Sequence, residues 1–450
     1  MKDEKISTLP TIAALATPAG RGAIAIVRIS GENATMIARK ITRSENLAPR
    51  YAHLKTLYGA DGAAFDRAIV IYFAAPKSYT GEDIVEFQTH GGEAAARALI
   101  AEITRRGAVL AKPGEFSLRA VKNSKMSLAE AEAAAAYASA RAEKAAKLLA
   151  RTLSGDLAKF AAEARSRILR AMAHAEVSID YAEDLPSDVF GAIKSQIDEL
   201  LALLDEVLIA SKRRRGLVKG YEIAIIGKPN AGKSSLLNAL LGEERAIVSE
   251  IAGTTRDLVS EEIVIGDAAA RIIDTAGLRH SADRLENIGI EYAKKAAAKA
   301  DITIALFDGS REFEAEDREV LELAMKSPIR VAAINKCDLE VKINLSEFRD
   351  INYVKISAKK DIKELLAALK NILDRETGGE EIYLSSDRQI SLVESAIKNL
   401  TIASDLLSQN SPELFSYSCN EAIKNIGDLT TPIAYDELLD SMFSEFCLGK

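Results

Sequence analysis

The sequence predicts a multidomain α/β protein that consists of an N-terminal α+β domain, a split all-helical domain and an α/β domain inserted into the helical one. Three observations predict this class. Short Ile- and Val-rich runs bounded by turn residues occupy the N-terminal part, an Ala-rich stretch follows from about Ser127, and a glycine-rich loop lies between two helical blocks. A chain of 450 residues is also too long for one compact core, so about two or three domains are expected.

Residues 1–120 are predicted to form the N-terminal α+β domain. The runs AIAIVRIS (23–30) and AIVIYFAAP (68–76) are rich in Ile and Val and are bounded by Gly, Asp or Pro, which is typical of β-strands. In GGEAAARALIAEITRRG (91–107), apolar residues recur at helical spacing and predict a helix. Strands and helical segments of this length are typical of a small α+β domain.

The helical domain is predicted in two parts, residues 121–216 and residues 379–450. The first part is dominated by strong helix formers and contains almost no Pro or Gly. The second part contains two amphipathic patterns, DRQISLVESAIKNLTIASDLLSQ and DELLDSMFSEF. Neither block looks sufficient for a core of its own, so the simplest architecture is one helical domain from which residues 217–378 are looped out. The basic run 212–215 is interpreted as a solvated helix end before a linker, with a nucleic-acid patch as the alternative.

The overall composition excludes several classes of protein. The net charge of −7 and the pI of about 5.5 argue against a stand-alone RNA binder, which usually has a basic footprint. Three cysteines and four histidines show no ligand-like spacing, which argues against a disulfide framework and a structural zinc site. The start of the chain does not resemble a signal peptide, and no apolar run approaches the ~18 residues needed to span a bilayer. A cytoplasmic protein with no membrane partner is therefore expected.

The inserted domain begins with a phosphate-binding motif. GKPNAGKS, residues 227–234, fits the pattern G-x-x-x-x-G-K-[ST] and follows a predicted buried strand, with a predicted helix after it. The glycines allow backbone N–H groups and the helix N-terminus to face a phosphate. Lys233 is expected to reach the β- and γ-phosphates, and the Ser234 hydroxyl is expected to bind Mg²⁺. The alternative, a chance glycine turn, does not explain this context.

Four further motifs follow in the order of a GTPase. GTTRD (253–257) offers Thr255 as the second magnesium ligand, and DTAG (274–277) places Asp274 near the metal. NKCD (335–338) offers Asp338 as an acceptor for the guanine N1 and N2 groups, and SAK (357–359) closes the base pocket. Five motifs in register predict an inserted Ras-like P-loop GTPase (G) domain at 217–378 that binds GTP.

The predicted GTP-binding residues come from these motifs and from the segment before GTTRD. They are Asn230, Ala231, Gly232, Lys233, Ser234, Ser235, Ser249, Glu250, Ile251, Ala252, Gly253, Thr254, Thr255, Asp274, Thr275, Ala276, Gly277, Asn335, Lys336, Asp338, Ser357, Ala358 and Lys359.

The residue that follows DTAG is Leu278, whereas Ras-like GTPases have a water-orienting glutamine there. A leucine cannot orient water, so another group must do so or the domain is a poor hydrolase. Glu286, at the start of a predicted helix, carries a carboxylate that could position the water. The alternative interpretation of Glu286 is an ordinary exposed helix residue.

Taken as a whole, the sequence resembles the MnmE (TrmE) family of tRNA-modifying GTPases. Beyond the nucleotide motifs, the resemblance rests on ATPAGRGAIAIVRISG (16–31), SYTGEDIVEFQTHGG (78–92), KPGEFSLRA (112–120) and the terminal FCLGK (446–450). It covers essentially the whole chain. The family's architecture, an N-terminal α+β domain, a split helical domain and an inserted GTPase domain, is similar to the one predicted above.

The resemblance implies a homodimer that acts on tRNA together with an FAD-containing partner of the MnmG type. The implied product is an aminomethyl or carboxymethylaminomethyl group on C5 of the wobble uridine of certain tRNAs. It also implies that the N-terminal domain, residues 1–120, mediates dimerisation and binds 5-formyltetrahydrofolate or a related folate. The positions that match the family's folate-binding residues are Arg28, Glu86, Lys125 and Lys450. Their charges suit a ligand with a glutamate tail and a pterin edge.

The resemblance also implies hydrolysis that is triggered when two G domains meet, with K⁺ in the role of an arginine finger. The positions that match its ligands are Asn230, Ser249, Ile251 and Thr254. Glu286 matches the family's water-orienting glutamate, which favours the catalytic interpretation of that residue.

Two C-terminal features need separate interpretation. Cys447 is predicted to be functionally important, either as a reactive catalytic thiol near the folate site or as part of a conformational tail. Lipidation of Cys447 in the terminal CLGK is disfavoured. The chain also has Arg388–Gln389 where the family commonly has an Arg-His pair. We attach no function to that difference.

A competing hypothesis is a regulatory GTPase for ribosome assembly or stress, in which the helices serve as an interaction scaffold without one-carbon chemistry. Such a protein would associate with ribosomes in a GTP-dependent manner and would not bind folate.

Overall fold

The structure is a computed structural model, and it describes most of the chain. The described residues are 9–140, 142–180, 189–243, 260–266, 268–273, 297, 300–327, 329–376, 382–408, 412–431, 439, 442–444, 446 and 449. The chain divides into two compact units, the first made of Met1–Ala135, Leu153–Leu200 and Ser395–Lys450 and the second of Ala136–Thr152 and Leu201–Glu394. We describe each unit by itself. None of the helices in the described part is long and apolar enough to cross a membrane.

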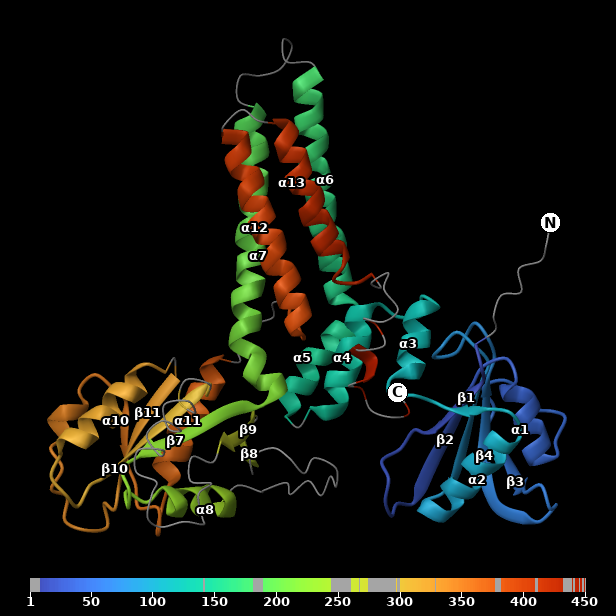
Figure 1. Ribbon diagram of the computed structural model, residues 1–450, viewed down its shortest axis with the longest axis horizontal. Helices are drawn as coiled ribbons and strands as arrows, with labels where there is room; N and C mark the ends of the chain where they lie inside the picture. The colour runs from blue at the N-terminus through green and yellow to red at the C-terminus, as the bar shows by residue number, and fades with distance from the viewer. Residues whose placement is uncertain are drawn as a thin grey trace, which may run out of the picture. The chain divides into compact units, whose positions relative to one another are not determined.

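The first unit begins with a six-stranded sheet in the order β3-β4-β5-β2-β1-β6 (Figure 1). Neighbouring strands are antiparallel except for β1 and β6, which are parallel. The elements of this part are β1 (Ile12–Leu15), β2 (Ile24–Ser30), α1 (Ala34–Thr42), β3 (His53–Tyr58), β4 (Ala64–Phe73), β5 (Ile84–His90), α2 (Glu93–Arg105), β6 (Val109–Leu110) and α3 (Glu115–Lys122).

Alternation along the strands of this sheet separates its two faces. On β2, Ala25, Val27 and Ile29 are buried in a core that also includes apolar residues of α1 and α2. The alternate residues Arg28 and Ser30 therefore point to the opposite face, where Ile12 and Ala14 of β1 belong to a second buried apolar cluster. The candidate folate-binding residues of β2 and β5 lie on that second face because of this period of two.

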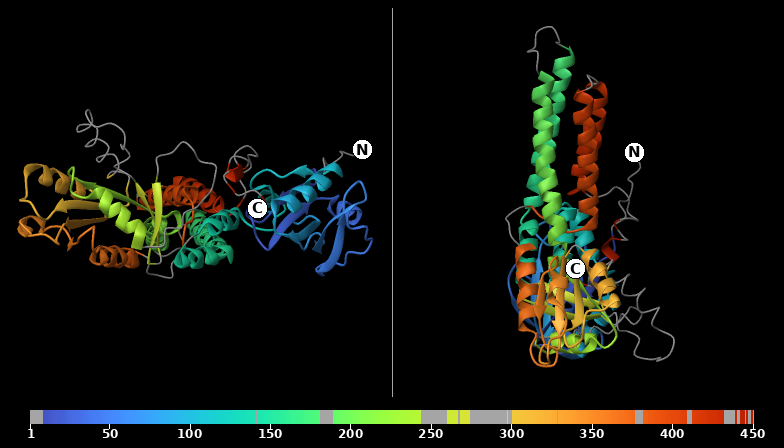
Figure 2. Two further views of the ribbon diagram at one scale, coloured as in Figure 1. Left: turned by 90° about the horizontal axis from the view of Figure 1, so that it is seen from below. Right: turned by 90° about the vertical axis from the view of Figure 1, so that its left-hand side faces the viewer.

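Long helices form most of the rest of the first unit and continue into the second. They are α4 (Leu128–Ser139), α5 (Glu143–Leu153), α6 (Asp156–Asp180), α7 (Val189–Lys219), α12 (Asp387–Ser408) and α13 (Pro412–Gly427). Within the first unit α13 packs along α6 (Figures 1 and 2), and the Ser404 hydroxyl donates to Asp198 Oδ1 at 2.7 Å, which links α12 to α7. The predicted helical character of both blocks is confirmed.

Gln389 is fully buried at the start of α12. Its Oε1 accepts a hydrogen bond from the backbone N–H of Ser385 at 2.7 Å. The glutamine therefore satisfies a backbone donor just before the helix begins, which is the ordinary role of a capping side chain.

The second unit contains a six-stranded sheet in the order β12-β11-β10-β7-β9-β8, in which only β8 is antiparallel to its neighbour. Two apolar clusters pack against this sheet. Its elements are β7 (Tyr221–Gly227), α8 (Lys233–Glu243), β8 (Ser260–Ile265), β9 (Ala268–Ile273), β10 (Ile302–Asp308), α10 (Ala315–Met325), β11 (Ile329–Asn335), η1 (Leu345–Phe348), β12 (Tyr353–Lys355) and α11 (Lys363–Glu376).

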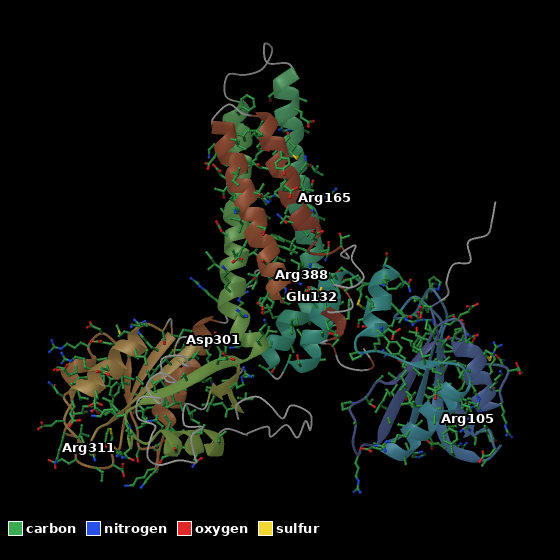
Figure 3. The ribbon with its side chains drawn as sticks, in the orientation of Figure 1. Arg105, Glu132, Arg165, Asp301, Arg311 and Arg388 are labelled. Atoms are coloured by element: carbon green, nitrogen blue, oxygen red, sulfur yellow. The ribbon has the colours of Figure 1, made fainter. Side chains whose placement is uncertain are left out.

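Polar residues lie at both ends of the central strands of the second sheet. Asp301, immediately before β10, accepts a hydrogen bond from the backbone N–H of Glu222 on β7 at 2.8 Å, and burial raises the pKa of Asp301 (Figure 3 labels it). At the other end, β7, β10 and β11 finish at Gly227, Asp308 and Asn335. The carboxyl ends of parallel strands are where α/β sheets bind ligands, so the motif loops converge there. The predicted multidomain α/β class is confirmed.

Candidate nucleotide site and sheet-face site

The phosphate loop connects β7 to α8, and two of its glycines are required by close approach. A Cβ added to Gly227 would lie 2.5 Å from the carbonyl oxygen of Leu306 on β10. At Gly232, where φ is +105°, an added Cβ would overlap Asn335 Nδ2. Asn230 also adopts a positive φ of 65°. The loop therefore wraps tightly at the end of the sheet, as a phosphate-binding backbone must.

Lys233 is the first residue of α8 and folds back over the loop. Its Nζ donates to the carbonyl oxygens of Gly227 and Lys228, each at 2.8 Å. Burial lowers the pKa of this ammonium, so its charge depends on the oxygen atoms around it. Ser234 follows in the first turn of α8 and is exposed, which leaves its hydroxyl accessible to a metal ion.

Asn335 joins the phosphate loop to the base-side loop. Its Nδ2 donates to the carbonyl of Ala231 and its Oδ1 accepts from the N–H of Ala358, both at 2.8 Å. The side chain is only 3% exposed. Sequence reasoning assigned Asn335 to GTP binding, but the bridge that it forms between two loops could not be read from the motif.

The base-side loops also lie together. The pKa of Asp338 is lowered by a hydrogen bond from Ser357 and by the charge of Lys360, whose Nζ is 3.5 Å from Asp338 Oδ2. Asp338 is therefore an ionised acceptor, the state needed to bind the two N–H groups of a guanine edge. The structure thus brings NKCD and SAK together at one edge of the sheet.

Sequence reasoning missed Asp308, which ends β10. Its Oδ2 lies 2.6 Å from Lys336 Nζ, and its Oδ1 accepts from the N–H of Ser310 at 3.0 Å. Burial by itself raises the pKa of Asp308, but the hydrogen bonds from Lys336 and Ser310 lower it overall. The carboxylate holds Lys336, which has a positive φ of 63°, beside the base-side loops. A polar residue at a strand end was the only signal in the sequence.

A second missed contact involves Lys228, the residue after Gly227. Its Nζ contacts Glu314 and lies 3.2 Å from Asp317 and 3.5 Å from Glu316, at the N-terminus of α10. Burial lowers the pKa of Lys228, but hydrogen bonds to Glu314 and Asp317 raise it overall. Glu314 and Asp317 also form a capping box for α10. The phosphate loop is therefore anchored to a second helix.

Many of the predicted site residues lie outside the described part of the chain, so the structure does not test them. They are Ser249, Glu250, Ile251, Ala252, Gly253, Thr254, Thr255, Asp274, Thr275, Ala276, Gly277, Glu286, Cys447 and Lys450.

The metal assignments can be examined at two described residues. Ser234 offers an exposed hydroxyl and Asn230 an exposed side-chain amide, and both are hard oxygen donors of the kind that Mg²⁺ and K⁺ prefer. No group of three or more His, Cys, Asp or Glu residues that could hold a metal ion occurs among the described residues. The donor set at the phosphate loop therefore fits cations that are bound largely through hydroxyl, carbonyl and phosphate oxygens.

On the second face of the first sheet, opposite the core formed with α1 and α2, Arg28 and Glu86 form a pair. The strand register sets them opposite each other on β2 and β5, with Arg28 Nε 2.9 Å from Glu86 Oε1. Their side chains are 21% and 16% exposed. The Arg28 guanidinium lies 5.4 Å from the ring centroid of Tyr79 and 5.6 Å from that of Phe116. We call these four residues the sheet-face site.

The C-terminal segment and Lys125 approach the same region. Arg28 donates to the carbonyl oxygen of Gly449 at 3.4 Å. Gly449 has a φ of +91°, and a Cβ there would overlap Leu15 O, so only glycine fits so close to β1. Lys125 is exposed, and its aliphatic stem lies 3.1 Å from the Cβ position of Gly81, in the loop that carries Tyr79. The structure brings Arg28 and Glu86 together and sets Lys125 beside the neighbouring loop.

Comparison with known proteins gives consistent matches. The family described as "GTP-binding protein TrmE N-terminus" matches residues 11–125, and the "MnmE helical domain" matches residues 128–447. A protein of Sulfurovum sp. (strain NBC37-1), named tRNA modification GTPase MnmE, is 47% identical over 443 residues, 98% of each chain. Proteins of the same name from Sulfurimonas denitrificans and Aliarcobacter butzleri are 46% and 45% identical, each over 98% of this chain and 99% of theirs.

Proposed function

The chain belongs to the tRNA modification GTPase MnmE family, and on that premise we propose that it hydrolyses GTP to modify the wobble uridine of certain tRNAs. The proposed product is a 5-carboxymethylaminomethyl or aminomethyl group, formed with an FAD-dependent partner of the MnmG type from a tetrahydrofolate one-carbon unit. The observation that carries the proposal is the joined nucleotide site, in which Asn335 connects the phosphate loop to the base-side loop.

The residues of the nucleotide site have distinct proposed roles. Lys233 moves its ammonium from the loop carbonyls to the β- and γ-phosphates of GTP, where its charge is compensated. Asp338 accepts from the guanine edge, and Asn335 keeps the two ends of the site at a fixed separation. Ser235, next to Ser234 in the first turn of α8, offers a backbone N–H to phosphate.

Ser234 and Thr255 are proposed to hold Mg²⁺, and Asn230, Ser249, Ile251 and Thr254 to hold K⁺ when the G domains of a homodimer meet. When bound, these cations offset the negative charge that develops on the phosphate oxygens. Glu286 orients the attacking water, the role that Leu278 cannot take. The exposed amide of Asn230, at a positive φ beside the phosphate loop glycines, supports its part in this proposal.

Asn230→Ala is expected to reduce the stimulation of GTP hydrolysis by K⁺ over Na⁺ by about tenfold or more, because one hard oxygen donor is lost near the transferring phosphate. The measurement is the rate of phosphate release in matched K⁺ and Na⁺ buffers. Asn238→Ala, at an exposed asparagine on α8, is the matched control and should respond as the unaltered chain does. Equal rates in both salts for the unaltered chain would contradict K⁺ activation.

The sheet-face site is proposed to bind 5-formyltetrahydrofolate or a related folate. A carboxylate such as Glu86 can accept two N–H groups of a pterin edge, and Arg28, Lys125 and Lys450 supply positive charge for the glutamate tail. Tyr79 offers a partly exposed aromatic ring beside Arg28, which supports binding of a flat ring, and the buried ring of Phe116 supports the Arg28 guanidinium. Cys447 is proposed to act near this site, as a thiol or as part of the tail.

The test of the whole proposal is made in cells. Mass spectrometry of nucleosides from cytoplasmic tRNA should show unmodified wobble uridine when the gene is deleted and its modified form when the gene is restored. A plasmid that carries Lys233→Ala serves as the matched control, because it retains the scaffold without the phosphate-binding ammonium. An unchanged nucleoside profile after deletion would reject the proposal.

A further inference from the structure

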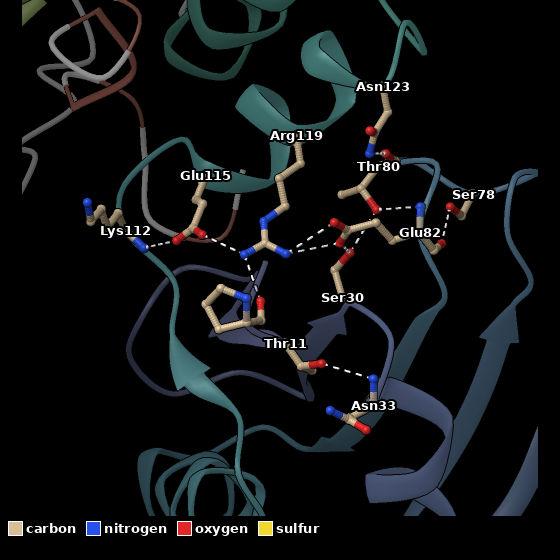
Figure 4. A network of polar contacts seen from close by, with 11 residues as sticks. Thr11, Ser30, Asn33, Ser78, Thr80, Glu82, Lys112, Glu115, Arg119 and Asn123 are labelled. Carbon is tan, nitrogen blue, oxygen red and sulfur yellow. Dashed lines mark hydrogen bonds and ion pairs between the residues drawn. The ribbon is translucent and has the colours of Figure 1, made fainter. Parts of the chain in front are cut away.

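A buried polar network lies beside the sheet-face site and centres on Arg119 of α3 (Figure 4). The Arg119 side chain is 2% exposed. One terminal nitrogen donates to both oxygens of Glu82, at 3.2 and 3.1 Å, and the other donates to Glu115 Oε1 at 2.7 Å and to Pro10 O at 2.8 Å. A single guanidinium therefore joins the segment before β1, the loop before β5 and the first turn of α3.

The loop before β5 is fixed further by a directional chain of hydrogen bonds (Figure 4). Glu82 Oε2 is an acceptor, so the Ser30 hydroxyl donates to it at 2.7 Å. Ser30 then accepts from the Thr80 hydroxyl at 2.7 Å, and Thr80 accepts from the backbone N–H of Glu82 at 3.2 Å. Ser30 and Thr80 are fully buried. These three hydrogen bonds form a closed ring that fixes the loop before β5 against β2.

Two of the three segments that Arg119 joins, the loop before β5 and the first turn of α3, carry the aromatic residues of the sheet-face site. Tyr79 lies between Ser78 and Thr80 in the loop, and Phe116 lies next to Glu115 in α3. The Tyr79 hydroxyl and the Ser117 hydroxyl are 2.8 Å apart, which links the segments a second time. Both rings lie over the Arg28 guanidinium, at 5.4 and 5.6 Å.

We propose that Arg119 is a positioning residue for a reduced folate at the sheet-face site: through Glu82 it holds Tyr79 in place beside Arg28, and through Glu115 it keeps the buried ring of Phe116 packed against the Arg28 guanidinium. The inference rests on the proposed folate site and adds a residue that does not touch the ligand. Arg119 is suited to this role because a planar guanidinium can serve several acceptors in a fixed geometry, which a lysine ammonium cannot reproduce.

The test compares Arg119→Lys and Ser30→Ala with the unaltered full chain by calorimetry with 5-formyltetrahydrofolate. Arg119→Lys should weaken the Kd by about 10- to 100-fold, the range expected when supporting contacts of a site are lost. Ser30→Ala removes one donor to Glu82 and leaves Arg119 in place, so a smaller loss in the same direction is expected. GTP hydrolysis by the same preparations should be unchanged, because the second unit carries the nucleotide site.

Arg97→Lys is the matched control. Arg97 also pairs with a glutamate one helical turn away, Glu93 at 2.7 Å, but on the exposed face of α2. The Kd of the Arg97→Lys variant for 5-formyltetrahydrofolate should equal that of the unaltered chain.

The binding stoichiometry separates positioning from a merely structural role. If Arg119 only stabilises the fold, Arg119→Lys will reduce the fraction of competent protein while the Kd of that fraction stays unchanged, and that result overturns the inference. Unchanged Kd values for both Arg119→Lys and Ser30→Ala overturn it as well. If the unaltered chain itself gives no heat with the folate, the proposed folate function fails and this inference fails with it.

Discussion

Lys233→Ala is expected to lower kcat/KM for GTP by about 100- to 1000-fold, the scale of losing one preorganised charge at a reacting phosphate. Lys233 Nζ is held by two loop carbonyls at 2.8 Å, and burial lowers its pKa. The ammonium is thus held at the phosphate loop, where the phosphates are proposed to bind. The measurement is the rate of GTP hydrolysis at several GTP concentrations in saturating Mg²⁺ and K⁺.

The control for this prediction is Lys212→Ala. Lys212 lies in the same compact unit, but it is half-exposed and pairs with Glu394 on the surface at 2.6 Å. Surface ion pairs contribute little to stability, so hydrolysis should match that of the unaltered chain. Comparable rates for Lys233→Ala and Lys212→Ala would show that the phosphate loop is not the site of hydrolysis.

Asn335→Ala is expected to weaken GDP and GTP binding by about 10- to 100-fold, because about 1–3 kcal/mol is lost for each buried polar group left without a partner. The substitution removes the partners of Ala231 O and Ala358 N, which lie on the phosphate loop and the base-side loop. Both halves of the nucleotide site therefore lose their fixed separation. Equilibrium binding of a fluorescent guanine nucleotide measures the effect.

Two further variants make this second prediction sharper. Asn335→Asp keeps an acceptor for Ala358 N but has no donor for Ala231 O, so it should also bind nucleotide weakly. Asn344→Ala removes an exposed asparagine that caps η1 in the same unit, and it should bind as the unaltered chain does. If Asn335→Ala binds nucleotide as tightly as Asn344→Ala does, the bridge has no role in forming the site.

Contiguous motifs predicted the parts of the nucleotide site that are built from contiguous backbone. GKPNAGKS predicted a loop between a buried strand and a helix, and β7 and α8 flank it as expected. The phosphate loop needs only local conditions, namely glycines at the tight turns and a helix that starts with Lys233, so the sequence was sufficient. The Ala-rich composition predicted the helical blocks for the same reason, because helix formation depends on local propensity.

Only the tertiary structure decided the contacts between segments that are far apart in the chain. The bridge from Asn335 to Ala231 spans 104 positions, and the anchor from Lys228 to Asp317 spans 89. Both follow from the order β11-β10-β7 in the second sheet, which no motif specifies.

At the sheet-face site, the strand register decided which residues are partners. Resemblance singled out Arg28 and Glu86, but the antiparallel register of β2 and β5 makes them a pair, and a shift of one residue would turn one of them into the core. Most residues of the network around Arg119 lie in the segments 78–92 and 112–120 that carry the resemblance, but nothing in the sequence indicated that Arg119 joins them. Local chemistry was therefore determined by the sequence alone, whereas the partners of each charge depended on strand order and register, because hydrogen bonds require atoms within about 3 Å of each other.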